Sequence, residues 1–231
     1  MAHPALTTVV VINHNYARFL RQSVWSVVQQ TRAPSVLVID DASSDESGAV
    51  LASLEAAHPE IAAVRLRENV GLSRVRNLAA SHATTEWIVF LDADDWLEPT
   101  YVEQAEAALA RSPDIHVLVP DMTLVRGDRR PRLVRSRIPR DWRELLKRNT
   151  IVQTSFLRRE LVNTLGGYDP QLDFEDWDFW VRALKAGGRF ARLPGAFVNR
   201  REHGANKSKV CDEAVATAAV RLKHRSTDQQ S

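Results

Sequence analysis

The first half of the chain alternates between short apolar runs and longer amphipathic segments, and this alternation restricts the fold more than any other feature. Four runs have the length and apolar content of buried strands: TTVVVIN (7–13), SVLVID (35–40), AAVRLRE (62–68) and EWIVFL (86–91). Three segments between them have helical patterns: 18–30, 45–58 and 72–83. We expect Ser43 or Ser44 to cap the second of these helices. Strands that alternate with helices form right-handed βαβ units, so we predict an α/β fold with one Rossmann-like, mostly parallel sheet flanked by helices.

The second half of the chain is less regular, but it carries helix and turn signals. We expect helices at 99–111, 141–148, 157–165 and 174–186, a strand at 115–120, and a hairpin or loop at 124–134. Gly166 and Gly167 suit the left-handed conformation that ends a helix. Because no repeat or low-complexity linker divides the chain, we predict one domain over 1–231, with a disordered tail at 225–231.

The composition is that of a soluble globular protein, with 44% hydrophobic and 26% charged residues. The single cysteine, Cys211, excludes an intramolecular disulfide framework and a cysteine-rich metal site. The N-terminal segment lacks the features of a signal peptide, and no window has the roughly 18 apolar residues of a membrane span. We therefore expect a cytoplasmic protein, either free or peripheral on the inner face of the cell membrane.

Polar side chains follow each of the four predicted strands at the point where the strand ends. They are Asn13 and His14, Asp40 and Asp41, Asn69, and finally Asp92 and Asp94. Ligands of open α/β sheets bind beyond the carboxyl ends of the strands. Since four consecutive strands deliver polar groups to one edge, we predict a binding site there.

The segment FLDADDW (90–96) places Asp92, Asp94 and Asp95 within four positions. Carboxylates in this pattern are ligands for Mg²⁺ or Mn²⁺, which complete their coordination with water and phosphate oxygens. The alternative is that Asp94 and Asp95 only cap the helix that begins near Pro99. The acidic residues after the second strand favour the metal interpretation, because they converge on the same edge.

Two common nucleotide-binding motifs are absent from the sequence. There is no GxxxxGK[ST] loop and no GxGxxG after the first strand, which excludes a Walker-type phosphate loop and a standard dinucleotide fingerprint. The sequence does not exclude a third mode of binding, in which acidic residues and a bridging metal ion hold the nucleotide.

Four ordered blocks resemble those of family 2 glycosyltransferases. They are VVVINHNYARFLRQSVWSVVQQT, VIDDASSDES, NVGLSRVRNLAASHATTEWIVFLDADDWLEP and GGYDPQLDFEDWDFWVRALKAGG, and the resemblance runs from about Thr7 to about Ser208 with a weaker middle. It implies a GT-A fold and an inverting, metal-dependent enzyme that uses a nucleotide sugar. It also implies a nucleotide-sugar-binding half at about 7–112 and an acceptor-binding half at about 113–210.

The resemblance implies a set of donor-binding residues: Asn13, Asn15, Asp40, Asp41, Asn69, Gly71, Arg76, Asp92 and Ala93. Asn13 and His14 stand where the family usually has Pro and Tyr in the base pocket. Asp41, with its neighbour, would contact the base, and Arg76 would lie near the diphosphate or the base. The alternative for Arg76 is a helix-surface arginine paired with a neighbour.

The implied metal ligands are Asp92, Asp94 and His203, with Mn²⁺ or Mg²⁺ as the cofactor. Asp94 would bind the ion between the two phosphates, and Asp92 would reach the ribose or the ion. His203 would be a third ligand or a phosphate contact, or else a surface histidine. Asp95 would support the cluster or cap the following helix.

The implied catalytic residues are Asp176, as the general base that deprotonates the acceptor hydroxyl, and Glu175 beside it. Trp177, Thr154 and Ser155 would contact the sugars on the acceptor side. For aromatic residues at helical spacing the alternative is core packing, which is the better interpretation of Phe179 and Trp180.

We therefore predict an inverting transferase that moves a sugar, with a UDP-sugar favoured as donor, to a glycan or lipid-linked acceptor. The alternatives are a non-catalytic nucleotide-sugar-binding or scaffolding descendant and a nucleotidyltransferase; the second lacks the glycine-rich segment that it needs after the first strand. The arginine-rich segment 126–148 would meet nucleic acid, anionic lipid or a phosphorylated ligand, or would simply be solvated. With the resemblance, we expect contact with an anionic membrane or a partner protein there, and no nucleic-acid partner.

Overall fold

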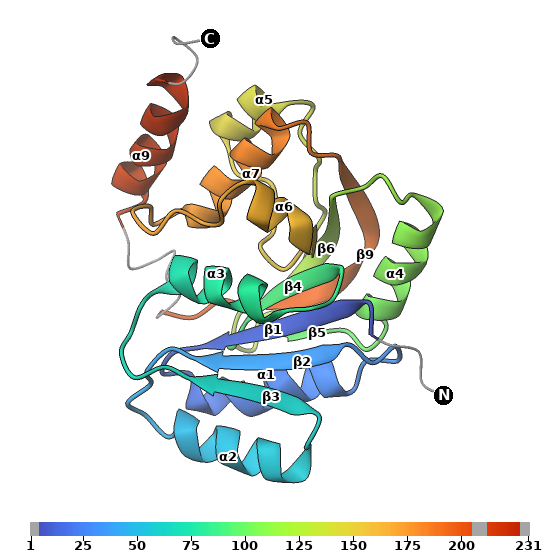
Figure 1. Ribbon diagram of the computed structural model, residues 1–231, viewed down its shortest axis with the longest axis vertical. Coiled ribbons are helices and arrows are strands. Elements are labelled where there is room, and N and C mark those ends of the chain that lie inside the picture. Colours follow the sequence, from blue (N-terminus) through green and yellow to red (C-terminus); the bar gives the residue numbers. More distant parts are fainter. Residues whose placement is uncertain (1–4, 205–211, 227–231) are drawn as a thin grey trace.

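The structure is a computed structural model that describes residues 5–204 and 212–226, so Cys211 lies outside it. Within these residues nine strands form one sheet, in the order β3-β2-β1-β4-β8-β6-β9-β5 with β7 paired to β6 (Figure 1). The strands are β1 (Thr7–Asn13), β2 (Ser35–Asp40), β3 (Ile61–Arg65), β4 (Trp87–Asp92), β5 (Trp96–Leu97), β6 (Val117–Val125), β7 (Arg132–Val134), β8 (Phe156–Arg158) and β9 (Phe190–Arg201). The helices are α1 (Ala17–Val28), α2 (Ser47–Ala57), α3 (Leu72–His82), α4 (Tyr101–Arg111), α5 (Trp142–Lys147), α6 (Arg159–Thr164), α7 (Glu175–Lys185) and α9 (Glu213–Ser226).

The four strands predicted in the first half are confirmed and pair in parallel, in the order β3-β2-β1-β4. All residues of β1 are buried, as its β-branched sequence predicts. The register places Asn13 beside Asp40 and Ile12 beside Asp92. The polar ends of these strands therefore meet at one edge of the sheet.

Helices cover both faces of the sheet and create two apolar cores. Val9 and Val11 of β1 face the core that α1, α2 and α4 complete, whereas Val10 and Ile12 face the core beneath α3, α6 and α7. In Figure 1, α1 and α2 lie below the sheet and α3 lies above it. This two-residue alternation explains why β1 has no polar face.

The second half departs from a simple parallel sheet. β8 is antiparallel to both β4 and β6, and β9 then runs parallel to β6 with register shifts at Pro120 and Asp121. The predicted hairpin is confirmed by the antiparallel pairing of β6 with β7. β5, β8 and the long β9 were not predicted, because short or irregular strands carry little periodicity of their own.

Helix ends were predicted with mixed success. Gly166 and Gly167 follow α6 with φ of 72° and 79°, which confirms the left-handed C-terminal stop. The predicted cap of α2 by Ser43 or Ser44 is wrong. Instead, Asp45 accepts a hydrogen bond from the Ser47 N–H at 2.9 Å, and both serines bond to residues at the end of β1 or β2.

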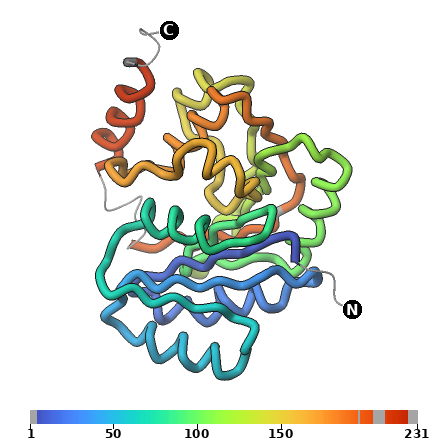
Figure 2. The backbone as a smooth tube through the Cα atoms, in the orientation of Figure 1, coloured from blue at the N-terminus to red at the C-terminus, as the bar shows by residue number. Residues whose placement is uncertain are grey.

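The C-terminal helix α9 was not predicted. It packs beside α7 at the end of the molecule away from α2 (Figures 1 and 2). The predicted disordered tail at 225–231 began two residues too early, because the helix continues through Ser226; the rest of that segment lies outside the described residues. In the described part of the chain, no helix is long and apolar enough to cross a membrane.

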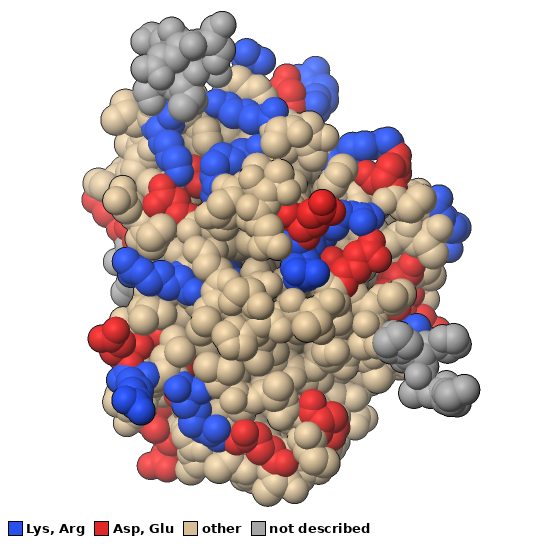
Figure 3. Space-filling model, viewed as in Figure 1, with Lys and Arg blue, Asp and Glu red and all other residues tan. Residues whose placement is uncertain are grey.

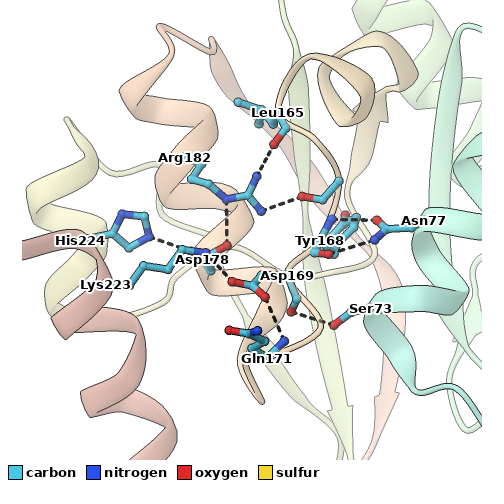
Figure 4. A network of polar contacts seen from close by, with 11 residues as sticks. Ser73, Asn77, Leu165, Tyr168, Asp169, Gln171, Asp178, Arg182, Lys223 and His224 are labelled. Carbon is cyan, nitrogen blue, oxygen red and sulfur yellow. Dashed lines mark hydrogen bonds and ion pairs between the residues drawn. The ribbon is translucent and has the colours of Figure 1, made fainter. Parts of the chain in front are cut away.

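A buried carboxylate joins α9 to α7 (Figure 4). Asp178 has no exposed surface and accepts hydrogen bonds from His224 Nε2 at 2.9 Å and Arg182 Nε at 2.8 Å, while Lys223 Nζ lies 2.9 Å away. Burial alone would raise the pKa of Asp178, but these three donors outweigh it and hold the pKa well below its usual range. The charge is therefore fully compensated inside the fold.

We expect Asp178→Asn to lower the free energy of unfolding by about 3 to 5 kcal/mol at neutral pH, because it leaves the surrounding donors without their counter-charge. Since the pKa is depressed in the folded state, this stabilisation is present above the unfolded value of about 4 and is lost as pH falls below it. Urea denaturation at neutral and acidic pH measures both effects. Asp114→Asn, which removes an exposed ion pair with Arg189, is the matched control and should cost about 1 kcal/mol at most. Equal losses in the two variants would contradict the role of Asp178.

Candidate active site

A tight turn at the end of β4 gathers three carboxylates. The Asp95 N–H donates to the Asp92 carbonyl at 2.9 Å, and the Ala93 N–H donates to Ile12 of β1, also at 2.9 Å. One carboxylate oxygen from each of Asp92, Asp94 and Asp95 lies within 4.8 Å of the others. The predicted acidic cluster therefore exists in three dimensions.

The described residues neutralise the negative charge of this cluster only in part. Asp92 Oδ1 is buried and accepts no hydrogen bond within the described residues, and an Arg76 guanidinium nitrogen lies 3.6 Å from it. Burial raises the pKa of Asp92, and burial together with its two acidic neighbours raises that of Asp95 well above the usual range. A set of carboxylate oxygens with an unused buried acceptor fits a hard divalent cation.

His203 lies against the cluster from the far end of the chain. Its Nε2 is 2.9 Å from Asp94 Oδ2, and its ring packs against Tyr16 and Phe19 with centroids 5.6 and 5.3 Å apart. Burial and the nearby Asp94 and Asp92 raise the pKa of Tyr16 to about 12, so its hydroxyl stays protonated. The structure thus brings His203 to the metal-ligand set that the sequence predicted, where its role as a ligand stays a prediction.

A cleft of about 550 Å³ opens beside the cluster. Five of the predicted donor and metal residues line it: Asp41, Asn69, Gly71, Asp92 and Asp94. The Asp41 carboxylate accepts hydrogen bonds from the Val70 N–H at 2.8 Å and the Gly71 N–H at 2.9 Å. Asp41 therefore shapes the loop between β3 and α3 that forms one wall of the cleft.

Other predicted donor residues lie behind the lining. Asn13 is buried and donates to Asp40 Oδ1 at 2.6 Å, and Ser43 donates to the same oxygen at 2.6 Å. Asn15, at φ of 59°, accepts a hydrogen bond from the Ser44 N–H at 2.8 Å. These contacts fix the loops after β1 and β2, and Ala93 is buried in the turn after β4. Their predicted contacts with the nucleotide sugar stay predictions.

Residues 170–173 form another wall of the cleft, and the segment 168–173 that contains them packs between α3, α7 and α9 (Figure 4). Asn77 of α3 bonds to both the N–H and the carbonyl of Tyr168, at 2.7 and 2.9 Å. Lys223 of α9 lies 2.8 Å from Asp169, and Ser73 donates to the Asp169 carbonyl at 3.1 Å. The C-terminal helix therefore helps to hold the wall of the cleft.

A second acidic centre stands at the start of α7. Glu175 is buried in an ion pair with Arg76, which also faces Asp92. Burial and the adjacent Glu175 raise the pKa of Asp176 to about 6. Asn149, after α5, donates to Asp176 Oδ2 at 3.3 Å. Arg76 therefore lies between the two acidic centres and does not line the cleft.

The residues predicted to contact the acceptor are packed inside the protein. Trp177 is 5% exposed and donates through Nε1 to the Leu145 carbonyl at 2.9 Å. Thr154 and Ser155 are buried. The Tyr101 hydroxyl donates to the Thr154 carbonyl, and the Ser155 hydroxyl donates to the Val152 carbonyl. None of the three lines the cleft, so their contact with a sugar stays a prediction.

Sequence reasoning gave no site role to several residues. Tyr16 and Arg200 line the cleft, and Asn149 touches the second acidic centre. His14, which the sequence had already placed at the predicted binding edge, also lines the cleft, with its Nδ1 2.7 Å from the Asp41 carbonyl. Tyr16 and His14 carried a signal, because they follow the end of β1. Asn149 carried none, since its position depends on how α5 packs against α7.

Comparison with known proteins identifies a matching family model and related sequences. Residues 8–165 match the family model described as "Glycosyl transferase family 2". "Glycosyltransferase GlyA" of Streptococcus pneumoniae is 33% identical over 97 residues, which are 42% of this chain and 14% of GlyA. The "Putative teichuronic acid biosynthesis glycosyltransferase TuaG" of Bacillus subtilis is 30% identical over 109 residues, or 46% of this chain and 43% of TuaG.

Two solved structures share the fold. TarS from S. aureus in complex with UDP-GlcNAc superposes with a TM-score of 0.73 at 19% identity, over 89% of this chain and 61% of that one. The mannosyltransferase PcManGT from Pyrobaculum calidifontis, in complex with GDP-Man and Mn²⁺, gives 0.71 at 21% identity, over 96% and 65%. The predicted GT-A fold is confirmed. The chain spans less than two thirds of each of these four proteins.

We expect Asp94→Asn to weaken Mn²⁺ binding at least roughly tenfold, because it removes one carboxylate ligand and the partner of His203. Electron paramagnetic resonance of free Mn²⁺, titrated in the presence of UDP, measures the affinity. Asp114→Asn is the control, since it removes an exposed carboxylate of the same charge far from the cluster in sequence. If Asp94→Asn folds normally and binds Mn²⁺ as tightly as the wild type, the cluster is not the metal site.

Proposed function

The chain belongs to glycosyltransferase family 2, and from that premise we propose that it transfers a sugar from a nucleotide-diphosphate sugar to a hydroxyl of a glycan or lipid-linked acceptor, with inversion at the anomeric carbon. One observation carries the proposal: two acidic centres of different chemistry share one buried arginine beside the cleft. The first has three carboxylates suited to a cation, and the second has one carboxylate poised as a base.

The donor is proposed to bind in the cleft, with residues 7–112 as the donor half. His14, Asp41 and Asn69 would surround the base, and UDP is favoured over GDP. Asp92 and Asp94, with His203, would hold Mn²⁺ or Mg²⁺. Bound there, such an ion supplies positive charge that neutralises the diphosphate as it leaves. Arg200, which lines the cleft, would face the same phosphates.

Asp176 is proposed as the general base in the acceptor half, 113–210. A pKa raised to about 6 leaves the carboxylate ionised at neutral pH, yet basic enough to accept a hydroxyl proton. Inversion requires the acceptor oxygen to attack the anomeric carbon on the face opposite the leaving diphosphate. The new bond joins acceptor oxygen to anomeric carbon, the bond to the phosphate oxygen breaks, and the proton passes to Asp176. Glu175 and Asn149 would fix the orientation of this carboxylate.

The proposed class of acceptor is inferred from the names of related proteins. TuaG is named for teichuronic acid biosynthesis, which supports a polysaccharide of the cell envelope as the acceptor here. A sugar hydroxyl of such an acceptor would be the nucleophile that Asp176 activates.

Isothermal titration of the wild type with UDP-glucose, UDP-GlcNAc and GDP-mannose, with Mn²⁺ and then with EDTA, tests the donor assignment. We expect one donor to bind only with metal. Asp176→Asn should bind that donor as the wild type does, because it lies outside the cleft lining, but should lose slow donor hydrolysis. If no nucleotide sugar binds in the presence of metal, the transferase proposal fails. Binding without any turnover would favour a non-catalytic descendant of the fold.

The rate of the wild type should fall as pH drops through about 6, because Asp176 then takes up a proton and can no longer act as a base. Above that pH the rate should level off. Asp176→Asn should reduce the rate roughly 10²- to 10⁴-fold and remove this pH dependence. Steady-state rates of both proteins across the pH range, at saturating donor and metal, test whether Asp176 is the general base. A wild-type profile that stays flat down to acidic pH would exclude Asp176 as the base.

A further inference from the structure

A second concavity, of about 460 Å³, lies between α5 and α9. We call it the basic groove, and it is lined by Trp142, Arg143, Leu146, Lys147, Arg221, His224 and Arg225. Arg221 fixes its geometry, because its guanidinium donates to the carbonyls of Leu146 at 3.2 Å and Lys147 at 2.6 Å. No acidic residue is among those that line the groove.

The cations at the groove differ from other cations of the arginine-rich segment. Arg137 and Arg140 both pair with Glu144, at 2.5 and 3.1 Å. Arg143, Lys147 and Arg225 are exposed, and none forms an ion pair within residues 5–204 and 212–226. Figure 3 shows Lys and Arg gathered on the upper part of this face, over α5 and α9. The positive charge there is uncompensated by the described chain.

An apolar surface adjoins the basic groove. α7 and α5 receive one face of α9, through Ala216, Val220 and His224. Its outward face carries Ala214, Val215, Ala218 and Leu222, which recur at helical spacing. Val215 is 63% exposed and Leu222 is 73% exposed, more than any other large apolar residue that the structure describes. α9 is therefore apolar on both faces, and only one of them is covered by the described protein.

Trp142 adds an interfacial anchor to the groove. It is partly exposed, and two cations lie against its ring: the Arg143 guanidinium, 4.3 Å from the ring centroid, and the Lys185 ammonium, 4.2 Å from it. Indole rings beside cations are favoured at the headgroup level of a bilayer, where an apolar body and a polar edge are both accommodated.

We propose that the basic groove and the outward face of α9 dock this protein onto an anionic phospholipid bilayer. The unpaired cations complement lipid phosphates, and the leucine and valine fit the boundary between headgroups and acyl chains. Nucleic acid would also satisfy the cations, but it offers nothing to the two exposed aliphatic side chains. The proposal goes beyond the transferase activity and does not depend on it.

This surface is connected to the candidate base. α5 supplies one side of the groove, and Asn149, two residues after the helix ends at Lys147, contacts Asp176. Docking through α5 and α9 would therefore hold the second acidic centre near the bilayer, where a lipid-linked hydroxyl is presented.

Sedimentation with vesicles tests the proposal, using phosphatidylcholine alone and an equimolar mixture with phosphatidylglycerol, at low and high salt. We expect binding to the anionic vesicles only, weakened by salt. Arg143→Gln combined with Arg225→Gln removes one cation from each helix and should weaken binding roughly 25-fold, at about fivefold per charge. The matched control is Arg21→Gln combined with Arg111→Gln, which removes the same charge from α1 and α4 and should bind like the wild type.

Leu222→Ser tests the apolar contact separately and should weaken binding at both salt concentrations, because it acts through burial and not through charge. Circular dichroism and nucleotide-sugar titration check that each variant folds, since none of these residues lines the donor cleft. Failure of the wild type to bind anionic vesicles would overturn the proposal, as would equal losses in the test and control pairs. Tighter binding to polyuridylate than to the vesicles at the same salt would assign the surface to nucleic acid instead.

Discussion

The buried ion pair between Arg76 and Glu175 is the contact on which the rest of the site depends. Arg76 comes from α3 in the first half of the chain and Glu175 from the start of α7, 99 residues later. Burial of the guanidinium opposes its charge, but Glu175 and Asp92 more than offset this and raise its pKa. One permanent cation therefore connects the end of β4 to the start of α7. If either acidic centre moved away, the buried guanidinium charge would lose part of its compensation.

The same cation explains how two acidic centres stay chemically different. The carboxylates after β4 crowd one another at a buried strand end, where their mutual repulsion is relieved by a bound cation or a proton. Asp176 stands on the other side of Arg76, in a site desolvated enough to make it a stronger base than a solvated carboxylate. Burying carboxylates with raised pKa values costs folding free energy. Such groups cluster at functional sites, where the shifted pKa suits binding or proton transfer.

The walls of the cleft are held by polar contacts between segments that are distant in sequence. Asp41 clamps the loop at Val70 and Gly71, and Asn77 clamps the facing segment at Tyr168. Lys223 of α9 pairs with Asp169 and so connects α9 to this facing segment. The hydrogen bond between His224 and Asp178 holds α9 against α7, and other residues of α9 line the basic groove. Such rigid walls prepare the cleft for a ligand, because less ordering is left for the moment of binding.

The sequence alone predicts the four parallel strands, the edge at which their polar ends meet and the acidic pattern at the end of β4. These features are local: strand burial follows from runs such as TTVVVIN, and parallel pairing brings their carboxyl ends together. Packing in three dimensions places Arg76 between the acidic centres instead of in the cleft, and it buries Trp177 inside the protein. The same packing brings Asn149 to Asp176 and Lys223 to Asp169. Those positions depend on how α5, α7 and α9 pack, and side-chain contacts across 27 or 54 residues leave no periodic signal in the sequence.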